Sequence, residues 1–367
     1  MTTVWALHAD APPERLAAVR LVTGTFAVGY LAVRSPAYLA LRDRSPDGFD
    51  GVGALSWMGG PVADPALVGA LVVALVSGVA FTAGAWFRVS GPAFALAVLL
   101  LATYRSSWGQ LLHFENLLVL HLLVLAVAAS ADAWSLDARR RPQQRRDRAY
   151  GPPLVLLCVV VVATYAIAGL AKLRYGGTAW ISGDTLRNHI AYSATRLEVL
   201  GGSPSPVASA VVPRPWALGP MAAASVLVEL AAPLALLGGW WRNTWVAAAW
   251  AMHAAIAALM FVVFPYPLFL VAFAPFFAPE RGVDRVAATL KSARKRSADR
   301  PAASASSHRP TAASDGEHER GEYQQQRRPQ APRAERPAAG EAELHLVGEG
   351  DAARPLPTPP VPGRDPA

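Results

Sequence analysis

The sequence has very few cysteines and lysines. Its single cysteine, Cys158, excludes an internal disulfide and a cysteine-based metal cage. Only three of the 34 basic residues are lysines, and Lys172 is the one inside the apolar part of the chain. Because arginine stays protonated whereas a desolvated lysine can become a neutral base, Lys172 is the first candidate for chemistry. The alternative is that Lys172 reaches the lipid head groups as a helix-end anchor.

Several catalytic signatures are also missing. Nucleophile elbows of the GxSxG type, phosphate-binding GxxxxGK loops and dinucleotide fingerprints do not occur. His113, His121, His253 and Glu115 are possible metal ligands, but HExxH spacing is absent, so no metal site is predicted. The net charge of +8 comes largely from arginines in connecting segments and towards the C-terminus, which argues against a nucleic-acid partner.

Long apolar runs dominate the chain. It is 53% hydrophobic and 16% charged, and several runs approach the roughly 20 residues that cross a hydrocarbon core. The runs are 16–33, 65–87, 92–104, 111–129, 153–173, 216–238, 245–264 and 267–278, of which the third and eighth are short. The prediction is an all-α polytopic transmembrane bundle of about eight helices, with six to eight possible, in a lipid bilayer.

The arginines predict how these helices are oriented. The segment 137–150 holds six arginines between two apolar runs, which marks that side as cytoplasmic. With eight crossings in the plasma membrane, both termini are then cytoplasmic and Lys172 lies at the outer end of the fifth helix. The first run carries Arg20 and lacks the features of a cleaved signal peptide, so we expect it to remain as an anchor.

Three regions follow from composition. Residues 1–280 form the predicted membrane domain, with Cys158 as a small buried side chain. Residues 281–297 are predicted to be a basic amphipathic segment on the membrane surface. Residues 298–367 are rich in proline, alanine, arginine and glutamate, and they predict a disordered cytoplasmic tail.

Ionisable residues inside apolar runs are costly and therefore candidates for function. The fourth run and the residues before it contain such a group. At 100° per residue His113, Asn116 and His121 lie within about 140° of a helical wheel, with Glu115 outside that arc. The whole group is Arg105, His113, Glu115, Asn116 and His121.

Two later runs each contain one such residue. Glu229 lies in the sixth run and His253 in the seventh. Glu229 is expected either to pair with an arginine or lysine in the membrane or to orient a base. Pro233, four residues further on, predicts a kink in that helix.

The sequence YAIAGLAKLRYGGTAWISG resembles a known family. A helix ending in Tyr-x-x-Ala-Gly-x-x-Lys-Leu, followed by Trp180 and Gly183, is similar to the membrane domain of vitamin K-dependent γ-glutamyl carboxylases and to bacterial proteins with the horizontally transferred transmembrane (HTTM) domain. Residues Tyr104, Trp108, His113, Trp134, Ser135 and Asp137 also match this pattern. The resemblance covers roughly residues 14 to 280.

The resemblance implies a chemistry. Lys172 would be the base that deprotonates a reduced quinone, either menaquinone or vitamin K hydroquinone, on the outer side of the membrane. His113, Glu115 and Asn116 would orient the quinone or polarise its oxygen. The expected quinone-binding residues are Arg105, Trp108, Trp180, Glu229 and His253, although both tryptophans could simply mark the membrane interface.

Arginines near Lys172 are expected to make it a better base. Partial desolvation and a like charge from Arg105, Arg174 or Arg187 would both favour the neutral amine.

The chain also departs from the carboxylases. It has no region comparable to the large lumenal part that binds the substrate's propeptide, so a protein glutamate is a doubtful acceptor. The alternative from another class is a non-catalytic membrane protein that assists maturation or export of a secreted peptide with a partner protein. A small-molecule transporter is a lesser alternative, because no internal repeat is visible.

Overall fold

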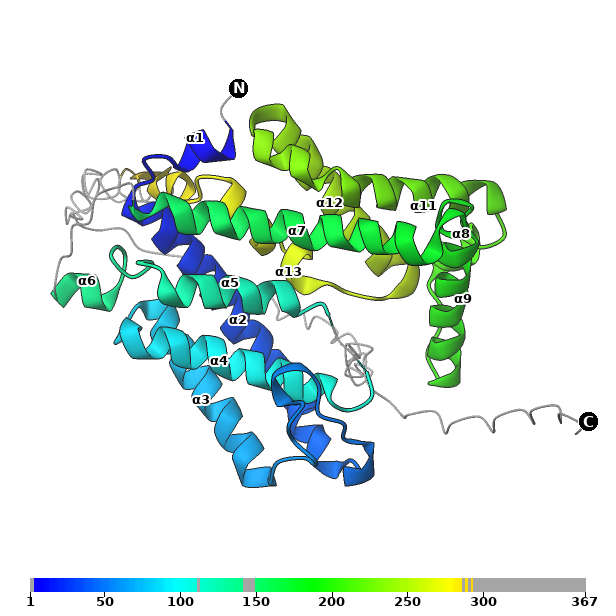
Figure 1. Cartoon of the computed structure of the whole chain (residues 1–367), viewed down its shortest axis with the longest axis horizontal. Helices are drawn as coiled ribbons and strands as arrows, with labels where there is room; N and C mark the ends of the chain where they lie inside the picture. The colour runs from blue at the N-terminus through cyan, green and yellow to red at the C-terminus, as the bar shows by residue number, and fades with distance from the viewer. Residues whose placement is uncertain (1–2, 111–112, 141–148, 286–287, 290–291, 293–367) are drawn as a thin grey trace, which may run out of the picture. The chain divides into compact units, whose positions relative to one another are not determined.

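The computed structural model describes residues 3–110, 113–140, 149–285, 288–289 and 292, and within these ranges it contains helices and no strand (Figure 1). The described residues up to Val283 belong to one compact unit, and Asp284 begins a second. The α-helices are α1 (Val4–His8), α2 (Pro13–Leu39), α3 (Asp64–Ala83), α4 (Phe87–Ser106), α5 (Asn116–Val127), α6 (Leu136–Arg140), α7 (Gly151–Gly176), α8 (Thr178–Ile181), α9 (Asp184–Val199), α10 (Pro206–Val211), α11 (Pro215–Leu230), α12 (Gly239–Met260) and α13 (Pro265–Leu268). The short 3-10 helices are η1 (Ala40–Asp43), η2 (Pro46–Gly48), η3 (Gly53–Leu55), η5 (Ala232–Leu237) and η6 (Val271–Phe276).

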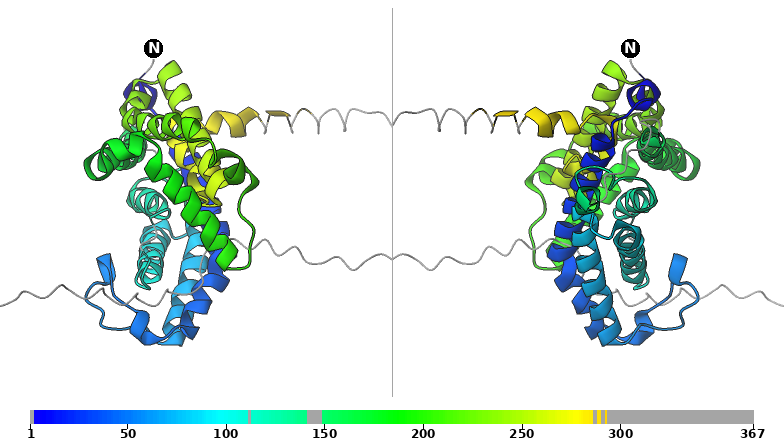
Figure 2. Two further views of the ribbon diagram at one scale, coloured as in Figure 1. Left: turned by 90° about the vertical axis from the view of Figure 1, so that its right-hand side faces the viewer. Right: turned by 90° about the vertical axis from the view of Figure 1, so that its left-hand side faces the viewer.

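Four of the described helices are long and apolar enough to cross a membrane. They span Pro13–Asp43, Asp64–Ala83, Phe87–Ser106 and Gly151–Gly176, and α5 and α11 are shorter apolar helices. The short third run of the sequence is therefore part of a full-length helix, α4. α3 packs against α2 and α4, and the three views show α2 and α3 running side by side (Figures 1 and 2).

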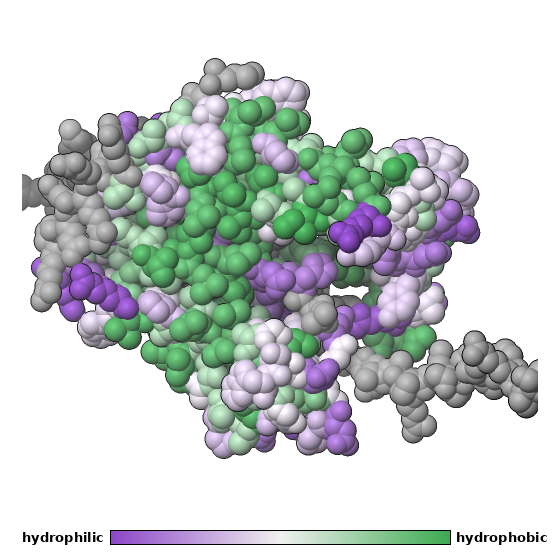
Figure 3. All heavy atoms as spheres, in the orientation of Figure 1, coloured by the Kyte–Doolittle hydropathy of each residue, from purple (hydrophilic) through white to green (hydrophobic). Residues whose placement is uncertain are grey.

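Exposed apolar side chains show what surrounds these helices. Apolar residues cover much of the face over α7, α5 and α4 (Figure 3). Leu100, Leu120 and Leu170 are among those left exposed on these helices. Soluble proteins rarely expose apolar patches of this extent, and the chain is therefore a membrane protein.

The eighth apolar run is not a continuous α-helix, an outcome within the six to eight helices expected. Instead α13 and η6 form a broken path, because Pro265, Pro267 and Pro275 remove backbone donors that a continuous helix needs. Phe264 at its beginning contacts His113 across 5.6 Å between ring centroids.

Side chains of neighbouring helices satisfy the carbonyl groups along this broken path. The Trp250 indole donates to the Leu268 carbonyl at 3.0 Å, and Arg242 donates to the Phe276 carbonyl at 3.0 Å. His8 Nε2 donates to the Pro275 carbonyl at 2.8 Å. Irregular backbone is tolerated at membrane depth only where protein surrounds it, and most of η6 is buried.

Helices α7 and α11 approach each other closely at a glycine. A Cβ added to Gly169 would lie 3.0 Å from Cβ of Glu229 and 3.0 Å from Cδ2 of Leu230. α11 ends at Leu230, and Pro233 follows in η5, so the expected kink is a break from α-helix to 3-10 helix. The break places Glu229 in the last turn of α11, beside Gly169.

Arginines gather at one end of the unit, where α7 begins. At one end, here called the arginine end, Arg20 on α2 is fully buried and donates to the carbonyls of Ser130 (2.5 Å) and Trp134 (2.6 Å), next to Arg139 and Arg140 of α6. α7 begins at this end, where the Tyr150 hydroxyl donates to Asp132. Lys172 lies 21 residues beyond Gly151, or about 30 Å along the helix, at the opposite end.

The predicted surface segment 281–297 lies largely outside the described residues, and the predicted tail 298–367 lies wholly outside them. Residues 280–285 begin a helix. The sole cysteine, Cys158, is fully buried on α7, as expected.

Candidate functional site

Lys172 on α7 and Glu229 on α11 form an ion pair. Lys172 Nζ lies 2.5 Å from Glu229 Oε1, although the residues are 57 positions apart in the sequence. The Lys172 side chain is 23% exposed and that of Glu229 is 7% exposed, so the pair lies mostly inside the protein. Gly169 makes the contact possible, because a side chain there would push α11 away. Of the two roles expected for Glu229, the pairing with a membrane lysine is the one observed.

Trp180 covers this lysine. Its ring centroid lies 5.0 Å from Lys172 Nζ, a cation–π distance. α8 carries Trp180 back over the end of α7, and a Cβ at Gly176 would collide with the indole. The other neighbour of the ring is His189 of α9, whose ring stacks on it with centroids 5.7 Å apart. Trp180 therefore separates the ammonium group from α9.

Tyr165 and His253 form a second polar pair nearby. The Tyr165 hydroxyl and His253 Nε2 share a hydrogen bond of 2.7 Å. Tyr165 precedes Lys172 by seven residues on α7, so both side chains point to the same face of that helix. Glu229 Oε2 and His253 Nδ1 are buried without a hydrogen-bond partner among the described residues. Lys172, Glu229, Trp180, Tyr165 and His253 are together called the lysine site below.

A cavity of about 340 Å³ lies next to the lysine site, between α9 and the end of α12. Trp180 lines the cavity and also covers Lys172, and Phe264 lines it while its ring lies 5.0 Å from that of His253. Leu197 and Phe261 add apolar walls, and Arg196 adds a charge. Its volume is at the lower end of the roughly 300–1,000 Å³ typical of small-molecule sites.

The family comparison is consistent with this arrangement. A model of the HTTM domain matches residues 10–281, a range that contains the whole lysine site. The chain belongs to the HTTM family. No curated protein and no solved structure matches it.

A second buried ion pair joins α4 to the start of α5 in this HTTM domain. Arg105 lies 3.0 Å from Glu115, and the Tyr30 hydroxyl of α2 donates to the same carboxylate oxygen at 2.7 Å. The guanidinium also lies 5.4 Å from the Phe114 ring centroid and 5.9 Å from that of Tyr38. These contacts hold three helices together at the lysine end, separately from Lys172.

The helical wheel predicted for the fourth run does not describe its N-terminal part. α5 begins at Asn116, so His113 and Glu115 precede the helix and the 100° spacing does not apply to them. Glu115 and His121 are buried, whereas His113 and Asn116 are exposed. His121 Nδ1 and the Tyr266 hydroxyl share a hydrogen bond of 2.6 Å. The structure does not bring His113 or Asn116 into the lysine site.

The two tryptophans of the predicted site have different surroundings. Trp108 is buried against Phe49 and Tyr104, with ring centroids 5.4 Å and 6.0 Å away. It is thus part of a hydrophobic core and not an interfacial anchor. Trp180 alone of the two contacts the lysine.

Two of the three arginines expected near Lys172 have other neighbours. Arg105 pairs with Glu115, and the Arg174 guanidinium lies over the Tyr175 ring at 5.7 Å. Arg174 is two residues beyond Lys172 and points about 200° around the helix from it. The ion-pair partner of Lys172 is a carboxylate, that of Glu229.

Sequence reasoning missed the tyrosine hydroxyls that complete these groups. Tyr30 and Tyr266 were not identified, and Tyr165 was identified only as part of a motif. A buried tyrosine in an apolar run normally needs a partner for its hydroxyl, and that signal was available. Among the described residues no three histidine, cysteine, aspartate or glutamate side chains gather as a metal site.

Proposed function

We propose that this HTTM protein is a membrane enzyme related to the vitamin K-dependent carboxylases, in which Lys172 is the base. The ion pair between Lys172 and Glu229 under Trp180 is the observation that carries the proposal. The acceptor would be an extracytoplasmic molecule, because the lysine site lies at the end opposite the arginine end.

The pair itself can supply the neutral amine that a base requires. A paired lysine holds its proton, but across 2.5 Å this proton can move from Nζ to Glu229 Oε1. The transfer replaces two buried charges by two neutral groups, which a low-dielectric environment favours. Lys172 Nζ can then accept a proton from a substrate hydroxyl while Glu229 keeps the first one.

The cavity beside Trp180 suits a lipid-soluble quinone. Leu197, Phe261 and Phe264 give it apolar walls, and Trp180 connects it to the lysine site. These residues would hold a reduced menaquinone or vitamin K hydroquinone. When bound, that group supplies an ionisable hydroxyl and, with oxygen, a strong base that can modify an acceptor.

The test is epoxide formation from reduced menaquinone or vitamin K, with oxygen and bicarbonate, in membranes containing the protein. We expect product with the natural chain and at least about a hundredfold less with Lys172→Arg, because general-base catalysis contributes about that much or more. Arginine preserves a charge for Glu229 but does not release its proton. Lys295→Arg makes the same exchange outside the HTTM match and serves as the control.

A non-catalytic role in maturation or export of a secreted peptide is the second candidate. It is favoured by Arg105, Glu115 and Tyr30, which form a buried polar group and line neither the cavity next to the lysine site nor the larger one at the arginine end. Such a cluster stabilises a scaffold without chemistry. Unchanged product with Lys172→Arg, or no product from the folded natural chain supplied with peptide acceptors, would favour this role.

A further inference from the structure

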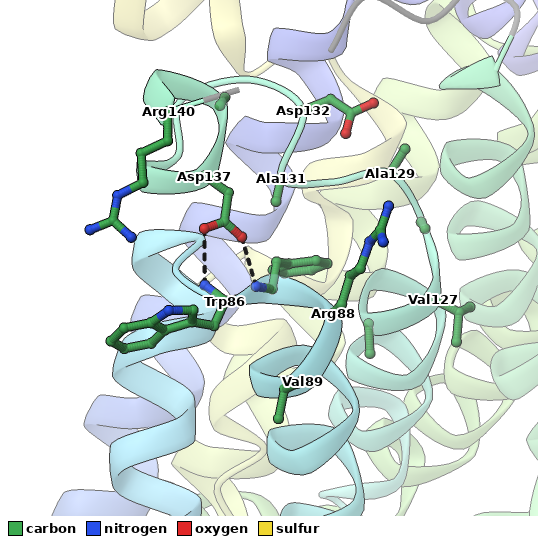
Figure 4. A pocket seen from close by; sticks show the side chains of 13 residues that line it. Trp86, Arg88, Val89, Val127, Ala129, Ala131, Asp132, Asp137 and Arg140 are labelled. Carbon is green, nitrogen blue, oxygen red and sulfur yellow. Dashed lines mark hydrogen bonds between the residues drawn. The ribbon is translucent and has the colours of Figure 1, made fainter. Parts of the chain in front are cut away.

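A larger cavity lies at the arginine end, far from the lysine site. Its volume is about 640 Å³, and it is lined by the turn between α3 and α4, the end of α5 and the segment leading into α6 (Figure 4). The residues used below are Trp86, Arg88, Val89, Val127, Asp132 and Arg140. None of them belongs to the lysine site.

The acidic groups in this cavity are already occupied. Asp137 accepts hydrogen bonds from the backbone N–H groups of Trp86 (3.0 Å) and Phe87 (2.8 Å), and it thereby caps the start of α4 (Figure 4). Asp132 accepts from the Tyr150 hydroxyl at 3.1 Å. Arg20 lies behind Asp137, and their attraction offsets part of that negative charge.

The basic groups are exposed. Arg88 and Arg140 are both exposed side chains that line the cavity, and neither forms an ion pair within the described ranges. Figure 4 shows the two guanidinium groups on opposite sides of Asp137, each extended away from its carboxylate. Two arginines that border one cavity can bind an anion with charge-assisted hydrogen bonds.

Apolar side chains surround the same cavity. Val127 is 84% exposed, Val89 is 70% exposed and Trp86 is 70% exposed. On a membrane helix such residues face acyl chains, and tryptophan is typical of the level of the head groups. The combination matches an amphiphile better than a free anion, because a free anion makes no use of the exposed valines.

We propose that this cavity binds the head group of an anionic phospholipid from the leaflet at the arginine end. Arg88 and Arg140 attract the head group from its two sides, Trp86 lies at the interface, and the acyl chains run along Val89 and Val127. Basic pockets between membrane helices on the cytoplasmic side bind anionic head groups by the same chemistry. The cavity volume of about 640 Å³ is within the range typical of small-molecule sites and is sufficient for a head group.

The experiment is native mass spectrometry of the purified full chain, titrated with phosphatidylglycerol or with phosphatidylcholine of the same acyl chains. We expect the natural chain to retain phosphatidylglycerol preferentially. Arg88→Gln/Arg140→Gln is expected to weaken that binding at least about tenfold, since each basic residue near an anionic surface contributes about 1 kcal/mol. Inorganic phosphate, added in excess, is expected not to displace the lipid.

The control is Arg42→Gln/Arg187→Gln, which removes two exposed arginines outside this cavity. This variant should bind phosphatidylglycerol as the natural chain does. Equal retention of both lipids by the natural chain, or the same loss in both double variants, overturns the proposal. Displacement by inorganic phosphate would assign the site to a free anion and overturn the lipid assignment. Thermal unfolding of each variant confirms that it is folded.

Discussion

Lys172 and Glu229 depend on each other energetically. Both side chains lie mostly out of water, so an unpaired charge at either position would lose hydration without gaining a partner. Removal of both charges is a smaller perturbation than removal of one. The pair can therefore be tested for its structural contribution independently of any catalytic role.

A double-mutant cycle measures this coupling. We expect Lys172→Met alone to lower the free energy of unfolding by on the order of 3 kcal/mol, because it leaves Glu229 buried and unpaired. The double variant Lys172→Met/Glu229→Leu should recover most of that loss. Thermal unfolding in detergent gives both values. Additive losses in the double variant would show that the two side chains do not interact.

The sequence predicted single residues better than it predicted their partners. Lys172 was found because lysine is rare in this chain, and Glu229 because it interrupts an apolar run. Their contact depends on how α7 and α11 pack at Gly169, and residue spacing along one helix carries no information about that. The same limit explains why arginines were expected beside Lys172 where the structure has a carboxylate.

At the scale of elements, the length of the apolar runs predicted the long helices, but it did not predict where the backbone is irregular. The regions of α2, α3, α4 and α7 were predicted from their apolar runs. The path through α13 and η6 is as apolar as a membrane helix. Its conformation is determined by its prolines and by the side chains that donate hydrogen bonds to its carbonyl groups. These hydrogen-bond donors come from other parts of the chain, so the sequence of the segment itself does not reveal them.

His8 on α1 donates a hydrogen bond to the Pro275 carbonyl of this path, and this contact makes the free energy of unfolding depend on pH. His8 is fully buried, and burial lowers its pKa to about 4, with Arg15 and Arg242 adding to the effect. The unfolded chain takes up this proton near pH 6.5, whereas the folded chain does so only near pH 4. The contribution of His8 to stability is thus complete above pH 6.5 and is lost as the pH falls towards 4.

Unfolding midpoints at several pH values between 7.5 and 4.5 check this prediction. The free energy of unfolding should fall by up to about 1.4 kcal/mol per pH unit because of this one group. His8→Gln keeps an amide donor for the Pro275 carbonyl without titrating, and it should flatten the slope. His189→Gln, at an exposed position, should not. An unchanged slope in His8→Gln would contradict the assignment.

At the scale of the whole molecule, the open question is its orientation in the membrane. Arg139 and Arg140 lie at the arginine end, and Trp57 lies in the connection between α2 and α3 at the other. The positive-inside bias then predicts that both termini are cytoplasmic, since the path through α13 and η6 returns the chain to Arg15 and Glu280. Although that path is not an α-helix, it takes the chain back to the end where α2 begins. The number of passes therefore stays even, as in the eight-pass topology expected from the sequence.

Cysteine labelling tests this orientation. With Cys158 replaced by serine, Trp57→Cys should react with a membrane-impermeant maleimide in intact cells, because Trp57 is highly exposed. Arg139→Cys should react only after the cells are permeabilised. The reverse pattern would invert the topology and move the lysine site to the cytoplasmic side.

The broken path from Phe264 to Phe276 also constrains how the protein is made. Its carbonyl groups find their donors on α1 and α12, which are synthesised earlier. A translocon can release a continuous apolar helix into lipid by itself, but this segment would expose unpaired backbone there. We expect it to leave the translocon only when α1 and α12 are in place to donate these hydrogen bonds. Assembly would then end with the packing of this segment, and a chain truncated before residue 264 would leave the donors His8, Arg242 and Trp250 without their carbonyl partners.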